Sequence, residues 1–364
     1  MKILYWAVHD PSYPRNERLR AYLQEELAAE ITVVARPDHG SRASRLWQQG
    51  RAAFTAPTDY SIVILSEFSL LYAFASKIAA LRSRAIHIVD FFVGFEETEI
   101  GDFALHSRLS LRAYALRSVD RFAVRSATVC LTDTRPRATR FAKRFGRRFL
   151  PLPVGAPDWA TTVEMREPEA DVLYYGNYLP LHNTLALVRG IAAAEPSPLP
   201  SIFIGDGPSR GATEALVRSL GLNERIQFLD ALPPSEIGRH MGGAQVVAGI
   251  FGDSDKAREV VANKVWQSLT AGIPTVTRSS PALDDLGDAT PKNLLTVQGV
   301  SPDLIARAIE SGRTMRSQSA IDVGATRDSL QCYVASGYKA FGSTLVDLVG
   351  ASDRKARPRP TSPK

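Results

Sequence analysis

The sequence predicts an α/β protein built from two doubly wound domains. Its 364 residues exceed what a single hydrophobic core usually holds, so two domains are expected. Short apolar segments alternate with helical patterns along the chain, as in parallel sheets wrapped by helices. Between the two halves, Pro153–Asp171 carries prolines and acids with little apolar periodicity, which is typical of a linker. We therefore expect domains at 1–154 and 155–325, with the boundary near Gly155.

The first half contains six predicted strands, each a short apolar run next to a helical pattern. They are Lys2–Val8, Ile31–Ala35, Ser61–Leu65, Ala85–Val89, Thr128–Leu131 and Arg148–Leu152. The segment Asn16–Ala29 is expected to be a helix, because Leu19, Tyr22, Leu23 and Leu27 fall on one face.

The second half repeats the alternation with six more predicted strands. They are Asp171–Tyr175, Ser201–Ile204, Ile226–Leu229, Val246–Ile250, Pro274–Thr277 and Asn293–Val297. The last helical pattern, Thr326–Val349, is long for this domain alone and can return to pack on the first domain. The remaining residues, 350–364, are basic and rich in proline, so we expect them to be disordered.

The composition is that of an ordinary globular protein, with 45% hydrophobic and 23% charged residues. Two cysteines, Cys130 and Cys332, lie in apolar contexts and are interpreted as core thiols in a reducing compartment. The N-terminus lacks the pattern of a signal peptide, and no apolar run approaches the about 18 residues of a spanning helix. We therefore expect a cytoplasmic protein.

Positive charge is concentrated between Ala104 and Leu150, a segment with twelve Lys or Arg and two acids, while the whole chain has a net charge of +6. Five arginines recur there at helical spacing among apolar residues. They are Arg108, Arg112, Arg117, Arg121 and Arg125. Such a surface suits an anionic membrane, and a solvated helix face is an equally good interpretation. Nucleic acid is disfavoured, because no recognised binding module accompanies the charge.

Ligands of open α/β sheets bind at the carboxyl ends of the strands, so the loops there are candidate sites. The loop after the first strand of the second half contains Gly176, Asn177 and His182. The glycine permits close backbone approach, and the histidine can donate to a phosphate. Asn183 or Thr184 can cap the next helix and point its N–H groups at that phosphate. An ordinary turn with a surface histidine is the alternative.

A second loop, Ile204–Pro208, places Gly205 and Asp206 after the next strand. It is a tight turn of a kind common in α/β proteins, so it indicates a binding site only together with the neighbouring loops.

The most informative segment is Ile250–Thr277. Within it, Asn263 and Lys264 open an apolar-periodic helix. A helix start offers free backbone N–H groups and a positive dipole end to an anion, and Lys264 adds a point charge. We expect the phosphates of a nucleotide to bind here. Glu259 and Gln267 flank this helix start and can accept hydrogen bonds from ribose hydroxyls, although Glu259 can equally be a solvated acid.

The first domain offers a loop after its first strand, where Asp10, Tyr13, Arg15 and Asn16 occur. Arg15 and Asn16 start the next helix, so a contact with a donor or acceptor phosphate is reasonable. Asn16 can also be no more than a helix cap.

Three acids of the first domain are candidates for orienting an acceptor hydroxyl. Asp90 ends a predicted strand and faces the cleft by position, and Glu97 and Asp102 follow it. Pairing with nearby arginines is an equally good interpretation of Glu97 and Asp102.

Together these motifs resemble the GT-B glycosyltransferases of retaining family 4, also called group 1. In the second domain the resemblance lies in YYGNYLPLHNTLALVRGI, FIGDGPSRGATEALVRSLGLNERIQFLDALPPSEIGRHMGGAQVVAGI and NKVWQSLTAGIPTV, in that order and spacing. In the first domain HDPSYPRNERLRAYL, VDFFVGFEETEIGDF and TVCLTDTRPRATRFAKRFG look like a bacterial branch that acts on surface polysaccharide or glycolipid.

The resemblance implies transfer of a sugar from a nucleotide diphosphate to a saccharide or lipid-linked acceptor. The second domain would hold the donor and the first the acceptor. Many members have Arg and Lys where Asn177 and His182 stand, so Lys264 would supply the missing charge, with Arg258 assisting. The paired glutamates of the family map onto Glu259 and Gln267.

The resemblance also implies neither a cofactor nor a metal, since helix N-termini and basic groups neutralise the leaving diphosphate. Retention without a clear enzyme nucleophile suggests that this phosphate accepts the proton of the acceptor. Three functions stay open: a transferase at the inner membrane face, an epimerase or soluble-glucan enzyme of the same fold, and a non-catalytic binding or scaffold protein.

Overall fold

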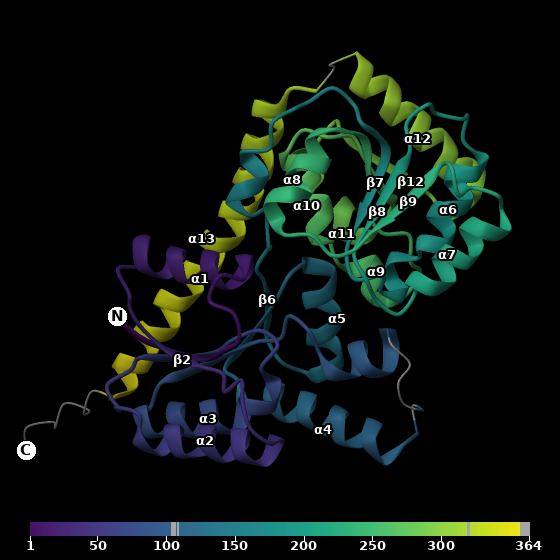
Figure 1. The fold of residues 1–364 in the computed structure, drawn as a ribbon. Coiled ribbons are helices and arrows are strands. Elements are labelled where there is room, and N and C mark those ends of the chain that lie inside the picture. The colour runs from purple at the N-terminus through teal and green to yellow at the C-terminus, as the bar shows by residue number, and fades with distance from the viewer. Residues whose placement is uncertain (103–106, 108, 319–320, 357–364) are drawn as a thin grey trace, which may run out of the picture.

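The computed structural model describes residues 1–102, 107, 109–318 and 321–356. Over these residues the chain forms two parallel six-stranded sheets, and all twelve predicted strands are present within two residues of their expected ends. Long apolar runs buried on both faces favour parallel strands, because helices must then cover each face of a sheet. The prediction of an α/β protein with two doubly wound domains is confirmed (Figure 1).

The first sheet has the strand order β2-β1-β3-β4-β5-β6. Its strands are β1 (Lys2–Val8), β2 (Glu30–Ala35), β3 (Ile62–Leu65), β4 (Ile86–Asp90), β5 (Val129–Thr132) and β6 (Phe149–Pro151). Its helices are α1 (Pro14–Glu25), α2 (Arg42–Thr55), η1 (Leu70–Tyr72), α3 (Ala73–Ser83), η2 (Glu96–Asp102), α4 (Leu111–Ser126) and α5 (Arg135–Phe145). The chain reverses its winding direction between β1 and β3, and such a switch point is where an open sheet binds ligands.

The second sheet has the order β12-β11-β10-β7-β8-β9, with its switch point between β7 and β10. Its strands are β7 (Ala170–Tyr175), β8 (Ser201–Ile204), β9 (Ile226–Leu229), β10 (Ala244–Ala248), β11 (Thr275–Arg278) and β12 (Leu294–Val297). Its helices are η3 (Asp158–Thr161), η4 (Pro180–His182), α6 (Thr184–Ala193), α7 (Arg210–Ser219), α8 (Pro234–Gly242), α9 (Asp255–Glu259), α10 (Asn263–Thr270), α11 (Pro281–Asp284), η5 (Gly287–Ala289) and α12 (Pro302–Ser317).

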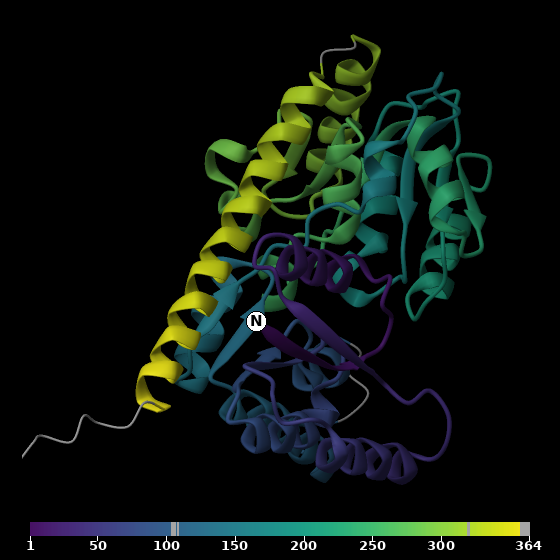
Figure 2. The ribbon, with the colours of Figure 1, turned by 90° about the vertical axis from the view of Figure 1, so that its left-hand side faces the viewer.

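The last helix, α13 (Val323–Ala356), runs beside both domains (Figure 2). Tyr338 meets Tyr22 of α1 edge to face with ring centroids 5.3 Å apart, while Trp266 of α10 packs against Tyr333. The hydrophobic core on this side is continuous from the first sheet through α13 to α10 and α11. The two domains are therefore joined by shared apolar packing as well as by the linker.

Two helices differ from their expected extent by more than two residues at an end. Helix α1 begins at Pro14 instead of Asn16, because proline suits the first turn of a helix. Helix α13 continues to Ala356, beyond the expected end at Val349, since alanine, arginine and lysine there favour helix. The rest of the predicted disordered tail lies outside the described residues.

Cys130 is buried as expected, but the prediction that Cys332 is a core thiol is wrong, because α13 exposes it.

Candidate functional site

The carboxyl ends of both sheets meet at the boundary between the domains. The C-terminal wall of this boundary consists of residues 176–184 and 205–208 and the first turn of α10. The N-terminal wall consists of residues 9–13, 66–69 and 91–102 and the first turn of α5. Asn263 on α10 donates its Nδ2 hydrogen to the Tyr13 hydroxyl over 3.5 Å, so the two walls touch. This contact places the sequence-predicted loops of both domains side by side.

Glycines shape the C-terminal wall because neighbouring backbone fills the space of a side chain. A Cβ on Gly205 would lie 2.2 Å from the Gly176 carbonyl oxygen, and one on Gly207 would lie 1.8 Å from that of Asn177. Gly176 itself has φ +139°, a conformation that L side chains rarely adopt. The two predicted loops therefore pack against each other as one unit.

Lys264 lies beneath this unit and is only 5% exposed. Its Nζ lies 4.1 Å from the centre of the Tyr174 ring and has no hydrogen-bond partner among the described residues. Burial lowers the pKa of the Lys264 ammonium well below its usual value. A Cβ on Gly176 would lie 3.2 Å from this nitrogen, so Lys264 reaches the glycine loop itself. Burial without a partner favours the neutral amine, and an arriving anion would favour the protonated ammonium and pair with it.

The N-terminus of α10 is also without a side-chain cap, since Ala262 occupies the capping position. By contrast, the side chain of Asn183 caps α6, as predicted, by accepting from the Ala186 N–H over 3.3 Å. Free N–H groups at a helix start favour an anion. The uncapped helix start and the unpaired lysine thus belong to the same turn.

His182 is a buried residue on the other side of Gly176 and not the surface histidine of the alternative interpretation. Its Nδ1 lies 2.7 Å from the Tyr174 hydroxyl. Burial, and then the nearby Lys264, lower the pKa of His182 to about 2. The ring is therefore neutral near pH 7, and its contribution to anion binding is limited to a hydrogen bond.

Three further donor-site candidates lie on α10 and on the two glycine loops. Gln267, one turn along α10 from Lys264, accepts from the Tyr175 hydroxyl at its Oε1 over 2.7 Å. Asn177 is exposed beside Gly176. The Asp206 carboxylate is exposed and accepts from the Gly207 N–H over 2.7 Å, which stiffens the second glycine loop.

Arg258 does not lie with Lys264 and the glycine loops. It is exposed on α9 and donates to the Asp253 carboxylate, with Nη2 2.5 Å from Oδ1. Asp253 and Asp255 form an Asp-x-Asp sequence that the expectation of a metal-free site did not take into account. Asp253 is also bound by Arg278 at 2.6 Å. Within the described part of the chain, no three His, Cys, Asp or Glu side chains gather as metal ligands.

Glu259 faces the N-terminal wall, where Arg140 of α5 binds it with Nε 2.5 Å from Oε2. The hydroxyl of Thr134 also donates to its backbone carbonyl. Burial raises the pKa of Glu259. Its carboxylate is thus engaged across the domain boundary.

Arg140 and Arg137 both bind Glu97, and Arg137 also binds Asp133 over 3.0 Å. Although burial opposes it, the paired arginines lower the pKa of Glu97 to about 2. Asp120 positions this segment by accepting from the N–H groups of Phe95 and Glu96 at 3.0 and 2.9 Å. Arginine pairing, one of the two interpretations of Glu97, is what the structure displays.

Arg15 and Asp90 form a fully buried ion pair, with Nε 2.7 Å from Oδ2 and Nη2 3.0 Å from Oδ1. Arg15 also donates to the carbonyls of Leu152 and Thr132. Each group neutralises the other, so neither is free in this structure to bind a phosphate or to orient a hydroxyl. This placement differs from the expected substrate contacts because the sequence did not indicate that the two residues pair.

The remaining first-domain candidates lie near this ion pair. Asn16 is buried, does not cap α1, and donates to the Asp10 carbonyl over 3.1 Å and to Glu67 over 3.3 Å. The exposed Asp10 carboxylate accepts from the backbone and hydroxyl of Ser12. The side chain of Asp102 lies outside the described residues. Glu67, Tyr174 and Tyr175 were missed by sequence reasoning, because no spacing signal marks a buried partner.

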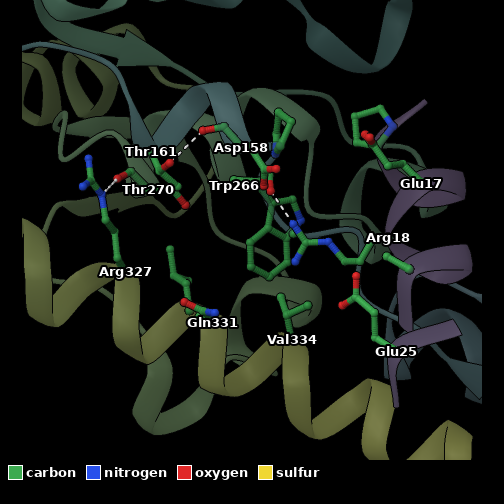
Figure 3. A pocket seen from close by; sticks show the side chains of 16 residues that line it. Glu17, Arg18, Glu25, Asp158, Thr161, Trp266, Thr270, Arg327, Gln331 and Val334 are labelled. Carbon is green, nitrogen blue, oxygen red and sulfur yellow. Dashed lines mark hydrogen bonds between the residues drawn. The ribbon is translucent and has the colours of Figure 1, made fainter. Parts of the chain in front are cut away.

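A cavity lies between the two domains on the side of α13 (Figure 3). Its volume is about 520 Å³, and α1, the linker, α10 and α13 enclose it. Arg18 reaches across it to the Ala156 carbonyl, and Arg327 donates to the Thr270 carbonyl over 2.8 Å. None of the expected donor-site residues lines it.

Comparison with known proteins relates this chain to others by structure alone. No protein-family model and no curated protein sequence matches it. HepE of Anabaena in complex with UDP superimposes with a TM-score of 0.65 at 15% identity, covering 95% of this chain and 100% of that one. Sucrose-phosphate synthase of Thermosynechococcus elongatus gives 0.65 at 14% identity, with 96% and 100% covered.

The lipopolysaccharide outer core galactosyltransferase WaaB in its apo form gives a TM-score of 0.60 at 13% identity, covering 95% of this chain and 99% of that one. These likenesses extend over both domains and the connection between them. Together with the two switch-point sheets that face each other, they establish that the chain has the GT-B fold, with two Rossmann-like domains, that these glycosyltransferases share.

Proposed function

We propose that the protein is a glycosyltransferase that uses a nucleoside diphosphate sugar and binds its diphosphate at Lys264. The observation that carries the proposal is the buried side-chain nitrogen of Lys264, which has no hydrogen-bond partner among the described residues and lies between Gly176 and the uncapped start of α10. An anion there would gain a charge-assisted bond in a site of low dielectric. The GT-B fold and the UDP bound to HepE support this ligand class.

The chemistry follows from where charge develops. The bond between the anomeric carbon and the diphosphate oxygen breaks, and the acceptor oxygen bonds to that carbon. The hydroxyl proton passes to the leaving diphosphate, so no enzyme nucleophile is required for retention. Lys264 and the α10 N–H groups would stabilise the negative charge on the leaving oxygen. Because this charge is met by protein groups, we expect transfer to persist in EDTA.

The other donor contacts follow from neighbours of Lys264. Neutral His182 would donate its remaining ring hydrogen to a phosphate oxygen. Gln267 would hold the ribose by its amide, which it can do without charge. Glu259 would contact the donor only after release from Arg140.

We propose further that a saccharide or lipid-linked acceptor is reached from an anionic membrane surface, through α4 and the turn before it. Leu109, Leu111 and Tyr114 are 95%, 90% and 65% exposed, and Arg112 and Arg121 lie on exposed positions of the same helix. Exposed apolar side chains flanked by arginine suit an anionic bilayer surface. No described helix is both long and apolar enough to cross a bilayer, so attachment would be peripheral. Arg117 is instead bound to Glu96, and Arg108 lies outside the described residues.

The test of the donor site measures melting temperature in the presence of UDP, ADP, GDP and dTDP. A ligand that binds only the folded state raises the melting temperature, and at a hundredfold excess over its dissociation constant it adds about 2.7 kcal/mol. We expect one diphosphate to do so, and the matching nucleotide sugar to be hydrolysed slowly in water. Binding without hydrolysis or transfer would favour a scaffold protein. No shift with any of the four would contradict the proposal.

A further inference from the structure

Three aromatic rings gather at the switch point of the first sheet. Tyr13 follows β1, Phe68 follows β3 and Phe92 follows β4. The centroid of the Phe68 ring lies 5.3 Å from that of Tyr13 and 5.7 Å from that of Phe92, with both pairs edge to face. The Arg15 guanidinium lies over the Phe92 ring, 4.9 Å from its centre, in a cation–π contact. We call Tyr13, Phe68 and Phe92 the aromatic platform.

The backbone under the platform is strained. Phe68 has φ +57°, a left-handed conformation that is rare for a bulky side chain, and its side chain is 36% exposed. Ala7 at the end of β1 has φ +56°, and the Ser69 hydroxyl donates to its carbonyl over 2.6 Å. Such residues cost of order 1–3 kcal/mol each and cluster at binding sites. Here the strain turns an apolar ring outward, where folding alone gains little from it.

Polar groups surround the platform. Glu67, directly before Phe68, is buried, and its carboxylate accepts from the Ser66 hydroxyl over 2.7 Å and from Asn16 over 3.3 Å. The exposed carboxylate of Asp10 lies in the loop that leads to Tyr13, and Asn263 touches the Tyr13 hydroxyl from the opposite wall. A lipid chain would need a continuous apolar surface, which this rim of carboxylates and amides interrupts.

We propose that the aromatic platform holds the terminal sugar ring of the acceptor, with the C–H face of a pyranose on Phe68. The proposal rests on the proposed function, since it identifies the second substrate as a saccharide. A pyranose has an apolar face and an equatorial rim of hydroxyls, which matches an exposed ring bordered by hydrogen-bonding groups. Asn263 directly precedes Lys264, so a sugar on the platform lies next to the wall proposed to bind the donor.

The test is saturation-transfer NMR with methyl β-D-glucopyranoside, methyl α-D-glucopyranoside, methyl β-D-galactopyranoside and octyl β-D-glucopyranoside, each with UDP present. We expect saturation of ring protons on one face of at least one sugar. Phe68→Ala and Phe68→Gly should each weaken that binding about tenfold. The glycine variant relieves the backbone strain, so loss of binding in both variants reports the ring and not misfolding. Phe54→Ala removes a 64% exposed phenylalanine from α2 and should change nothing.

In transfer assays with the sugar that binds, the KM for the acceptor should rise about tenfold in the Phe68 variants. Phe54→Ala should leave both the acceptor KM and the hydrolysis of the donor in water at the parent values. No saturation with any of the four compounds would overturn the proposal, as would binding through the octyl chain alone or unchanged binding in both Phe68 variants. A failure of nucleotides to shift the melting temperature would count instead against the proposed donor site.

Discussion

The two walls of the domain boundary differ in whether their basic side chains have partners within the protein. On the N-terminal wall Arg15 is bound by Asp90, and Glu97 by Arg137 and Arg140. On the C-terminal wall Lys264 is buried with no hydrogen-bond partner among the described residues. Charges that are paired within the protein can remain buried, whereas a buried amine without a hydrogen-bond partner is destabilising until an anion pairs with its protonated form. The difference supports the proposal that an anion binds at Lys264, whereas Arg15 and Glu97 are already paired within the protein.

The largest effect is expected from Lys264→Met, which keeps an unbranched side chain one atom shorter and removes the amine. Donor turnover should fall about 10² to 10³-fold, as when one preorganised donor to a developing anion is lost. The ligand-free protein should become more stable by about 1–3 kcal/mol, because a buried amine without a hydrogen-bond partner is gone. Turnover is measured by donor hydrolysis, and stability by urea unfolding.

The matched control is Lys292→Met, which removes an exposed lysine of the same domain. It should leave both quantities unchanged. A Lys264→Met protein with parent donor affinity and rate would end the assignment of this lysine to the diphosphate.

The next effect is expected from Asp90→Asn, which leaves Arg15 buried without its counter-ion. The free energy of unfolding should fall by about 3–5 kcal/mol. Replacing both partners, as in Arg15→Met with Asp90→Leu, should recover much of this loss. The shift in melting temperature caused by the nucleotide should persist in every variant that folds. An Asp90→Asn protein of parent stability that has lost transfer would instead favour the catalytic role predicted for Asp90.

A smaller effect is expected from Glu97→Gln, and it depends on pH. The folded-state pKa of Glu97 is lowered to about 2, below its unfolded value of 4.5, so its stabilisation is complete above pH 4.5. It is lost as the pH falls toward 2. Urea unfolding between pH 7 and pH 2.5 should therefore show a pH-dependent component of roughly 3 kcal/mol in the parent. That component should be absent from Glu97→Gln and retained in Glu224→Gln, which alters an exposed acid. Equal pH profiles of all three proteins would show that the arginine pairs do not stabilise the wall.

The smallest effect concerns the outer surface of the first domain. Leu109→Ser with Leu111→Ser should reduce flotation with anionic liposomes about tenfold, because less apolar surface can enter the bilayer. Leu220→Ser, which changes a 45% exposed leucine of the second domain, serves as control. Parent-like flotation of the double variant, or flotation that ignores lipid charge, would remove the membrane from the proposed function.

Much of the fold could be predicted because its signals are local. The twelve strands are apolar runs a few residues long, and the capping role of Asn183 follows from its own side chain. Helix ends were less predictable: α1 begins before Asn16 and α13 continues beyond Val349, because residues outside the apolar pattern also favour helix.

The candidate site likewise has features that follow from local sequence and features that depend on distant residues. The sequence by itself determined two doubly wound domains, the glycine loops at their strand ends and a lysine at the start of α10, since each depends on neighbouring residues. Only the tertiary structure decided that Asp90 meets Arg15, that Glu259 meets Arg140, and that Phe68 turns outward in a left-handed conformation. Whether a charged residue is paired depends on partners that are distant along the chain. Burial strengthens the electrostatic interaction of such a pair, so its loss is costly.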